Sequence, residues 1–327
     1  MVDYENKRIL ITGASGFIGR HLSRYLSRTL GCRHVFGLVR DARRAVPDPD
    51  ADVNYLVADL ADKRQVQRAL EEAKPQIVFH LAANTDRSPR LEDIDRMADD
   101  NVMGTIRLLQ AAARSERPPE AIVNVGTCEQ YGVFAAPATE DMPVRPVSLY
   151  AATKTASETI AAAICRLSSI PFAHVRPTLV YGPGQSERYF IPQAIRTFLR
   201  QEDLPMTPGE QTRDFLHVDD AVRGLVAVSR SADCFGQVVN LGSGRAVSLL
   251  EVARLLRRLT NSSSEILAGS LPYRPSETMR YACDISKITA LTGWRPEIPL
   301  EAGLRHTIDH LISSELEKNE LEKEAQG

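Results

Sequence analysis

The chain has 327 residues, enough for one large domain or two moderate ones, and its ordinary apolar and charged fractions exclude a disordered chain. Its 40 lysines and arginines nearly balance 42 aspartates and glutamates, so it lacks the basic surface of a nucleic-acid-binding protein. No apolar run reaches the ~20 residues that cross a bilayer, and the polar N-terminus has no apolar signal core. We therefore expect a cytoplasmic protein that contacts neither nucleic acid nor membrane.

Six short apolar runs predict strands at residues 7–13, 34–39, 53–59, 76–83, 121–127 and 171–178. Between them lie amphipathic stretches that predict helices at Gly19–Leu30, Lys63–Ala73, Ala98–Ser115 and Tyr150–Ser168. Strands that alternate with helices predict right-handed crossovers and an α/β fold built on a doubly wound parallel sheet, the Rossmann arrangement.

After Tyr181 proline and glycine become frequent, and helices are predicted at Pro192–Gln201 and Asp219–Ser229. A further strand at residues 237–242 is expected to return to the main sheet. We therefore assign residues 1–177 and this strand to a dinucleotide-binding domain. Residues 178–236 and 243–327 are assigned to a smaller C-terminal α/β substrate lobe, which ends in a charged tail.

The first predicted strand runs into a glycine-rich turn that opens a helix, with Gly13, Gly16 and Gly19 spaced by two residues. Glycine suits a sharp turn whose backbone must approach a pyrophosphate and pack closely on a helix. The helix N-terminus, with Phe17 and Ile18, then presents N–H groups and a positive dipole end to phosphates. This arrangement predicts a bound dinucleotide.

The end of the second strand decides between NAD and NADP, because an acidic residue there binds the ribose hydroxyls and an arginine suits the 2′-phosphate. Arg40 occupies this position, which favours NADP over NAD, although Asp41 follows it. Further cofactor contacts are expected from the ends of the next two strands, at Asp59, Leu60, Leu81, Ala82 and Ala83.

Tyr150 and Lys154 lie four residues apart and so share one face of a predicted helix. A phenol is a poor acid or base at neutral pH, and a neighbouring ammonium favours its ionised form. Thr127, after the preceding strand, can hold a substrate oxygen beside the phenol, and Asn101 lies on the intervening helix. These residues predict a proton-transfer site.

The chain resembles the extended short-chain dehydrogenase/reductases, and more narrowly their NAD(P)-dependent nucleotide-sugar epimerase, dehydratase and reductase group. From about Lys7 to His310 it carries, in order, TGASGFIG, HLAA, GTCEQYG, SLYAATK, VRPTLVYGPG, TRDFLHVDD, NLGSG and GWRPEIPLEAGL. The resemblance implies Thr127, Tyr150 and Lys154 as a catalytic triad. It adds Asn101 and Pro177 to the cofactor contacts.

The resemblance also implies a nucleotide-sugar substrate whose diphosphate is bound by Arg213 and Arg274. Two positions depart from the group's pattern. Leu179 stands where many members have an asparagine that helps to bind the diphosphate. Cys128 stands before Glu129, where 4,6-dehydratases of the deoxythymidine type have an aspartate before the glutamate.

These features favour redox chemistry at C4 of a nucleotide sugar, either reduction of a 4-keto-6-deoxyhexose or C4 epimerisation. One alternative is a 4,6-dehydratase or decarboxylase with Glu129 as base. Another is a non-catalytic dinucleotide-sensing regulator, which typically lacks the tyrosine and lysine kept here. The resemblance further implies a homodimer that pairs the Ala98–Ser115 and Tyr150–Ser168 helices of each subunit in a four-helix interface.

The five cysteines form no C-x-x-C pair and are odd in number, so neither a disulfide framework nor a zinc site is expected. We assign no metal to the chain on this basis. The cysteines are Cys32, Cys128, Cys165, Cys234 and Cys283.

Overall fold

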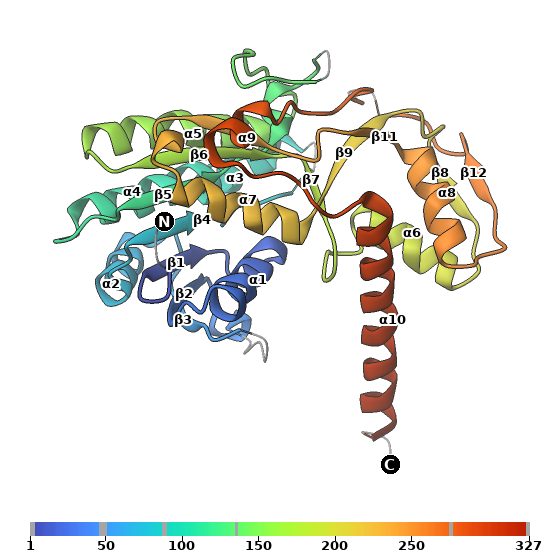
Figure 1. The fold of residues 1–327 in the computed structure, drawn as a ribbon, viewed down its shortest axis with the longest axis horizontal. Helices are drawn as coiled ribbons and strands as arrows, with labels where there is room; N and C mark the ends of the chain where they lie inside the picture. The colour runs from blue at the N-terminus through green and yellow to red at the C-terminus, as the bar shows by residue number, and fades with distance from the viewer. Residues whose placement is uncertain (1–3, 46–50, 87–89, 135–136, 275–276, 325–327) are drawn as a thin grey trace.

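A computed structural model describes residues 4–45, 51–86, 90–134, 137–274 and 277–324 (Figure 1). Its main element is a parallel seven-stranded sheet in the order β10-β6-β5-β4-β1-β2-β3, which confirms the predicted doubly wound α/β fold. The strands are β1 (Arg8–Thr12), β2 (His34–Val39), β3 (Asn54–Val57), β4 (Ile77–His80), β5 (Ala121–Val125), β6 (Phe172–Pro177) and β10 (Val238–Leu241).

Helices cover both faces of this sheet, because each strand is apolar on both sides. On β1, Ile9 and Ile11 face a core shared with α1 (Phe17–Arg24), α7 (Val218–Arg230) and α9 (Ser286–Thr292). Leu10, between them, faces the opposite core, with α2 (Lys63–Ala73), α4 (Gly104–Arg114) and α5 (Leu149–Leu167). Successive side chains of one strand thus pack against the helical layers on opposite faces of the sheet.

The predicted helices correspond closely to those observed. The helix Lys63–Ala73 has the predicted ends because the carboxylate of Asp62 accepts hydrogen bonds from the N–H groups of Arg64 and Gln65. The predicted helix at Ala98–Ser115 is longer than expected: α3 (Ile94–Ala98), a π-helical turn (Asp99–Met103) and α4 follow one another without a break.

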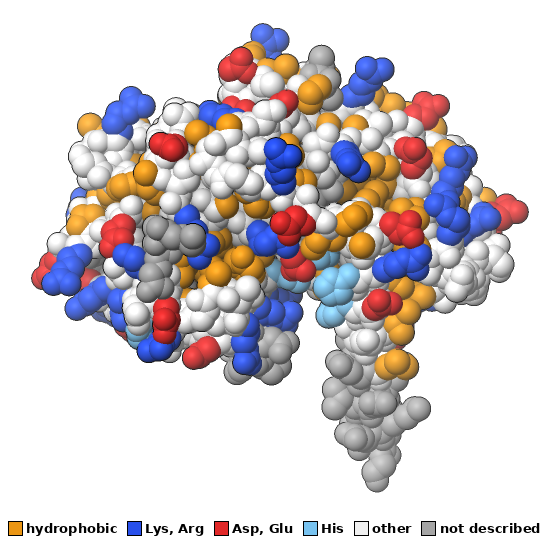
Figure 2. All heavy atoms as spheres, viewed as in Figure 1, with side chains coloured by type: hydrophobic (Ala, Val, Ile, Leu, Met, Phe, Trp, Pro, Cys, Tyr) orange, Lys and Arg blue, Asp and Glu red, His pale blue; other side chains and the backbone are white. Residues whose placement is uncertain are grey.

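The remaining chain forms a second unit around its own apolar core. It contains a three-stranded sheet of β7 (Leu179–Tyr181), β9 (Thr212–His217) and β11 (Ala246–Ser248), and a pair of β8 (Leu204–Met206) and β12 (Ile266–Ala268). The helices α6 (Phe190–Leu199), α8 (Leu249–Leu259) and α10 (Leu300–Glu324) belong to it, and α10 extends away from the body (Figure 1 and Figure 2).

Strand β10 pairs in parallel with β6, so the segment predicted to return to the main sheet does so. Helix α7, although it precedes β10 in the chain, packs on the large sheet through Ala221, Val222 and Leu225. The division of the chain into two domains stays a prediction. Among the described helices, none has the length and apolar character needed to span a bilayer.

Candidate functional site

The glycine-rich turn lies between β1 and β4, where the order of strands reverses. Gly13 has a φ of +71°, and a Cβ on it would lie 2.9 Å from the backbone nitrogen of Ala82. A Cβ on Gly19 would collide with the carbonyl oxygen of Gly13. The turn is therefore open only to glycine at these points, as a narrow cradle for a pyrophosphate requires.

Helix α1 begins directly behind this turn, at Phe17. Gly16 provides no side-chain cap, so the N–H groups of the first helical turn are available to an anion. Phe17 and Ile18 are half-buried at this helix end. The residues present thus fit a dinucleotide at the position where open α/β sheets bind one.

Arg40, the residue on which the NADP preference depends, is held by two carboxylates. A terminal guanidinium nitrogen of Arg40 lies 2.8 Å from Oδ1 of Asp100, and its Nε lies 3.7 Å from Oδ2 of Asp59. A 2′-phosphate would have to compete with both carboxylates for this half-exposed side chain. The preference for NADP stays a prediction.

Asn101 is buried and connects the segment after β4 to α5. Its Oδ1 accepts a hydrogen bond of 2.6 Å from the N–H of Asn84, and its Nδ2 donates to the Asn84 carbonyl and to Oγ1 of Thr153. Thr153 directly precedes Lys154. In this arrangement Asn101 fixes the backbone beside the predicted cofactor path.

A buried chain of hydrogen bonds, which no sequence motif predicts, crosses the centre of the sheet. His80 lies between Oγ1 of Thr12, at 2.7 Å, and Oγ1 of Thr105, at 2.8 Å, and Thr105 contacts Oγ of Ser157 on α5. Burial lowers the pKa of His80 to about 3, with help from the charge of Lys154, so the imidazole stays neutral. This chain joins β1, β4, α4 and α5.

Tyr150 and Lys154 lie one turn apart at the start of α5. The helix begins here because Oγ of Ser148 accepts the N–H of Ala151 at 3.1 Å. Tyr150 is 7% exposed and Lys154 only 2%. Burial lowers the pKa of Lys154 to about 8, while the charge of Glu158 opposes this shift.

Thr127 follows β5 and caps a short 3₁₀ turn, Cys128–Tyr131, that packs against α5. Its Oγ1 accepts the N–H of Glu129 at 3.2 Å, and its own N–H donates to Oε1 of Gln130 at 2.9 Å. These two bonds fix the Thr127 backbone and hydroxyl at the carboxyl end of the sheet. Glu129 is half-buried at the same edge.

Glu158, one turn beyond Lys154, anchors a buried polar cluster. Its carboxylate accepts hydrogen bonds from Arg176 at 2.7 and 3.1 Å and from Nε2 of Gln130 at 2.6 Å, and it lies 2.8 Å from Nε2 of His174. Burial alone would raise the pKa of Glu158, but His174 and Arg176 outweigh it and hold the pKa at about 2. The cluster joins the tyrosine–lysine helix to the turn that holds Thr127.

Cys128 points into the protein interior. Its thiol donates to the carbonyl of Arg176 at 2.9 Å, and the thiol of Cys283 donates to its sulfur at 2.8 Å. Both side chains are fully buried, and burial raises the pKa of Cys128 well above its ordinary value. All five cysteines are free and buried.

The two arginines predicted to bind a diphosphate differ in their surroundings. Arg213, on β9, donates to the carbonyls of Thr212 and Thr278, each at 2.7 Å, and forms an ion pair with Glu277. Arg274 is exposed, and its backbone carbonyl accepts from the N–H of Glu277. Leu179, which stands where many members of the group have an asparagine, is half-buried at the start of β7.

Fold and site define a class of protein: an α/β protein with a glycine-rich turn that fits a dinucleotide and with a buried tyrosine and lysine on one helix. The chain belongs to the NAD dependent epimerase/dehydratase family, whose profile matches residues 9–242. It is accordingly an enzyme of the extended short-chain dehydrogenase/reductase type, and the predicted resemblance is confirmed.

Individual relatives carry different activities. The chain is 28% identical to a dTDP-L-rhamnose 4-epimerase of Burkholderia thailandensis, over 96% of this chain and 97% of the relative. It is 30% identical to the human dTDP-D-glucose 4,6-dehydratase, over 93% and 89%. A solved UDP-glucuronic acid 4-epimerase of Bacillus cereus, bound to UDP-glucuronic acid and NAD, is 27% identical with a TM-score of 0.83, over 93% of this chain and 99% of that one.

Proposed function

We propose that this chain interconverts C4 epimers of a nucleotide-linked hexose through a transient 4-ketone. The observation that carries the proposal is the buried pair of Tyr150 and Lys154, one turn apart and next to the fixed Thr127. Oxidation and re-reduction at C4 require this triad and no further acid or base. Relatives with a 4-epimerase name give further support.

In the proposed mechanism the phenol oxygen of Tyr150 takes the proton of the C4 hydroxyl and later returns it. The positive charge of Lys154 stabilises the phenolate that forms. The Thr127 hydroxyl, already held by the N–H of Glu129, orients the C4 oxygen. Bound nicotinamide dinucleotide supplies the hydride acceptor and donor. Arg213 and Arg274 are proposed to bind the diphosphate of the substrate.

Dehydration is the second candidate, because relatives of 30% identity bear a 4,6-dehydratase name and Glu129 could serve as a base. The position of Cys128 argues against it. Dehydratases of the deoxythymidine type have an acid here, whereas this thiol is fully buried and donates to the Arg176 carbonyl. Glu129 is therefore proposed as a polar residue of the substrate pocket.

Isotope labelling separates these reactions. In deuterated water, a purified preparation is incubated with UDP- and dTDP-linked hexoses. NMR spectroscopy of the products gives the configuration at C4, and mass spectrometry gives the deuterium content and any loss of water. Epimerisation changes the configuration at C4 without placing deuterium on carbon, since the same hydride returns. Solvent deuterium at C5 with loss of water would establish dehydration and overturn the proposal. Net consumption of NADPH with a 4-keto-6-deoxy sugar would instead establish reduction.

Substitution of Arg40 tests the cofactor. If Arg40 binds the 2′-phosphate of NADP, Arg40→Ala is expected to weaken NADP binding by about tenfold or more and NAD binding far less, because a charge-assisted hydrogen bond is worth about 1.5–3 kcal/mol. Dissociation constants from fluorescence titration measure this difference. Arg20→Ala, an exposed arginine of α1, is the control. Equal weakening of both cofactors would leave Arg40 as a partner of Asp59 and Asp100 and would favour NAD.

The cytoplasmic location and the homodimer stay proposals of the same kind. Two exposed apolar side chains on the helices predicted to form the four-helix interface support the dimer: Met103 is 41% exposed and Leu167 is 88% exposed.

A further inference from the structure

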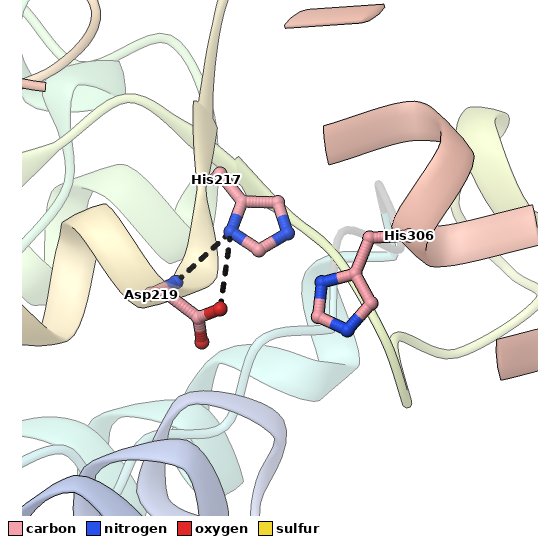
Figure 3. Close-up of side chains that lie close together, drawn as sticks. All are labelled: His217, Asp219 and His306. Carbon is pink, nitrogen blue, oxygen red and sulfur yellow. Dashed lines mark hydrogen bonds and ion pairs between the residues drawn. The ribbon is translucent and has the colours of Figure 1, made fainter. Parts of the chain in front are cut away.

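Three side chains of types that can bind metals meet outside the proposed catalytic site, where the two halves of the molecule join (Figure 3). His217 ends β9, Asp219 lies in the first turn of α7, and His306 lies on α10. Helix α7 covers the large sheet, whereas α10 packs in the smaller unit. The three residues are thus brought together only by the folded chain.

The three side chains can offer ligand atoms to one point. One ligand atom from each of them lies within 4.8 Å of the other two. The imidazoles of His217 and His306 are stacked, with centroids 5.5 Å apart and planes 24° apart. Figure 3 shows the carboxylate of Asp219 turned towards the space beside both rings.

One ring nitrogen of His217 lacks a hydrogen-bond partner among the described residues. The Nδ1 of His217 accepts the N–H of Asp219 at 3.2 Å, but its Nε2 is buried and has no hydrogen-bond partner in the part of the chain that the structure describes. Because Nδ1 accepts this bond, the proton of the neutral ring lies on Nε2, which is a buried donor without an acceptor among those residues. An unpaired buried polar atom costs about 1–3 kcal/mol. A cation bound to Nε2 removes this cost when the ring proton moves to Nδ1, which lies 3.6 Å from Oδ2 of Asp219.

Asp219 is also held from its other side. Its Oδ1 lies 3.2 Å from Nδ1 of His21, whose Nε2 donates to the carbonyl of Pro183 at 2.8 Å. His21 thus orients the carboxylate and leaves Oδ2, 3.6 Å from Nδ1 of His217, on the side of the two other rings. Outer partners of this kind commonly orient the ligands of a metal ion.

We propose that His217, Asp219 and His306 bind a divalent transition metal of the zinc class. Two imidazoles and one carboxylate match the ligands that zinc and cobalt prefer, and leave a position for water. Zinc–nitrogen bonds of about 2.0–2.1 Å require the ligands to draw closer than they stand here. The exposed side chain of His306 can make this movement, since only His217 is fully buried.

A metal here fastens α10 to α7. Through the contact between Asp219 and His21 it also supports α1, the helix that follows the glycine-rich turn. Its role is structural, because Tyr150, Lys154 and Thr127 belong to other elements. The proposal does not depend on the reaction assigned to the chain.

The test uses the full chain without an affinity tag, treated with a chelator and titrated with Zn²⁺ by calorimetry and with Co²⁺ by visible absorption. One ion per chain is expected to bind, and zinc is expected to raise the melting temperature. His306→Ala is expected to weaken binding by at least about tenfold and to abolish the thermal shift, as loss of a ligand must exceed loss of an outer partner. His306 is exposed, so this variant should fold.

Two further variants make the result specific. His306→Asp keeps a ligand atom and is expected to bind zinc more tightly than His306→Ala. His34→Ala removes an exposed histidine at the start of β2 and is expected to leave binding unchanged. Equal affinity of the wild type and His306→Ala, or no saturable binding by the wild type, would overturn the proposal.

Discussion

Replacement of Tyr150 by phenylalanine is expected to lower turnover by about 10²–10⁴-fold, the range that general acid–base catalysis contributes. The variant removes one oxygen from a side chain that is 7% exposed and leaves the ring in place. The glycine-rich turn and the end of β4 are untouched, so cofactor affinity should stay within a few-fold of the wild type. A large loss of turnover with intact cofactor binding assigns the proton transfer to the phenol.

Turnover of the nucleotide sugar and equilibrium binding of the dinucleotide are measured on the same preparation. Tyr25→Phe is the matched control, because Tyr25 lies in the turn after α1 and is only half-buried. It should retain the turnover of the wild type. Near-normal turnover of Tyr150→Phe would mean that another group moves the proton, and Glu129 would be the next residue to replace.

Much of the fold followed from local pattern. The six predicted strands and the returning strand form one parallel sheet because continuous apolar runs must be buried on both faces. The start of the helix Lys63–Ala73 could be predicted because Asp62, a common N-cap residue, directly precedes it. The side-chain contacts of Asn101, in the π-helical turn at Asp99–Met103, were not predictable, because its partners Asn84 and Thr153 are distant in sequence.

The candidate site was predictable where its residues follow one another on an element, as Tyr150 and Lys154 do. Glu158 continues the same four-residue spacing and could have been found by this signal. Its partners on β6 could not, because His174 and Arg176 reach it only through the packing of the sheet on α5. The contact of His217 with His306 is likewise invisible in the sequence, where 89 positions separate them.

Glu158→Ala is expected to lower the free energy of unfolding by about 3–5 kcal/mol, the usual effect of removing one partner of a buried ion pair. The Arg176 side chain is only 5% exposed and would lose its carboxylate, and Gln130 would lose the acceptor that positions it for Thr127. Urea unfolding at neutral pH measures the loss. Glu71→Ala, on the exposed face of α2, should change stability by less than about 0.5 kcal/mol.

The pH dependence of stability gives an independent check. The pKa of Glu158 falls from 4.5 to about 2 on folding, so its stabilising contribution is complete above the unfolded value and is lost as the pH falls from about 4.5 towards 2. The difference in stability between the wild type and Glu158→Ala should therefore shrink across this window. A difference that stays constant would mean that packing, and not the charge, carries the effect.

Glu158→Gln separates the charge of this residue from its shape. The amide can still accept from Arg176, so the variant should fold, but it no longer opposes the burial of Lys154. The pKa of Lys154, about 8 in the folded wild type, should then fall further. Since the ammonium stabilises the Tyr150 phenolate, activity should decline on the alkaline side from a lower pH than in the wild type. If turnover fell equally at every pH and the alkaline side of the pH–activity profile did not move, Glu158 would have only a structural role, as the partner of Arg176 on β6.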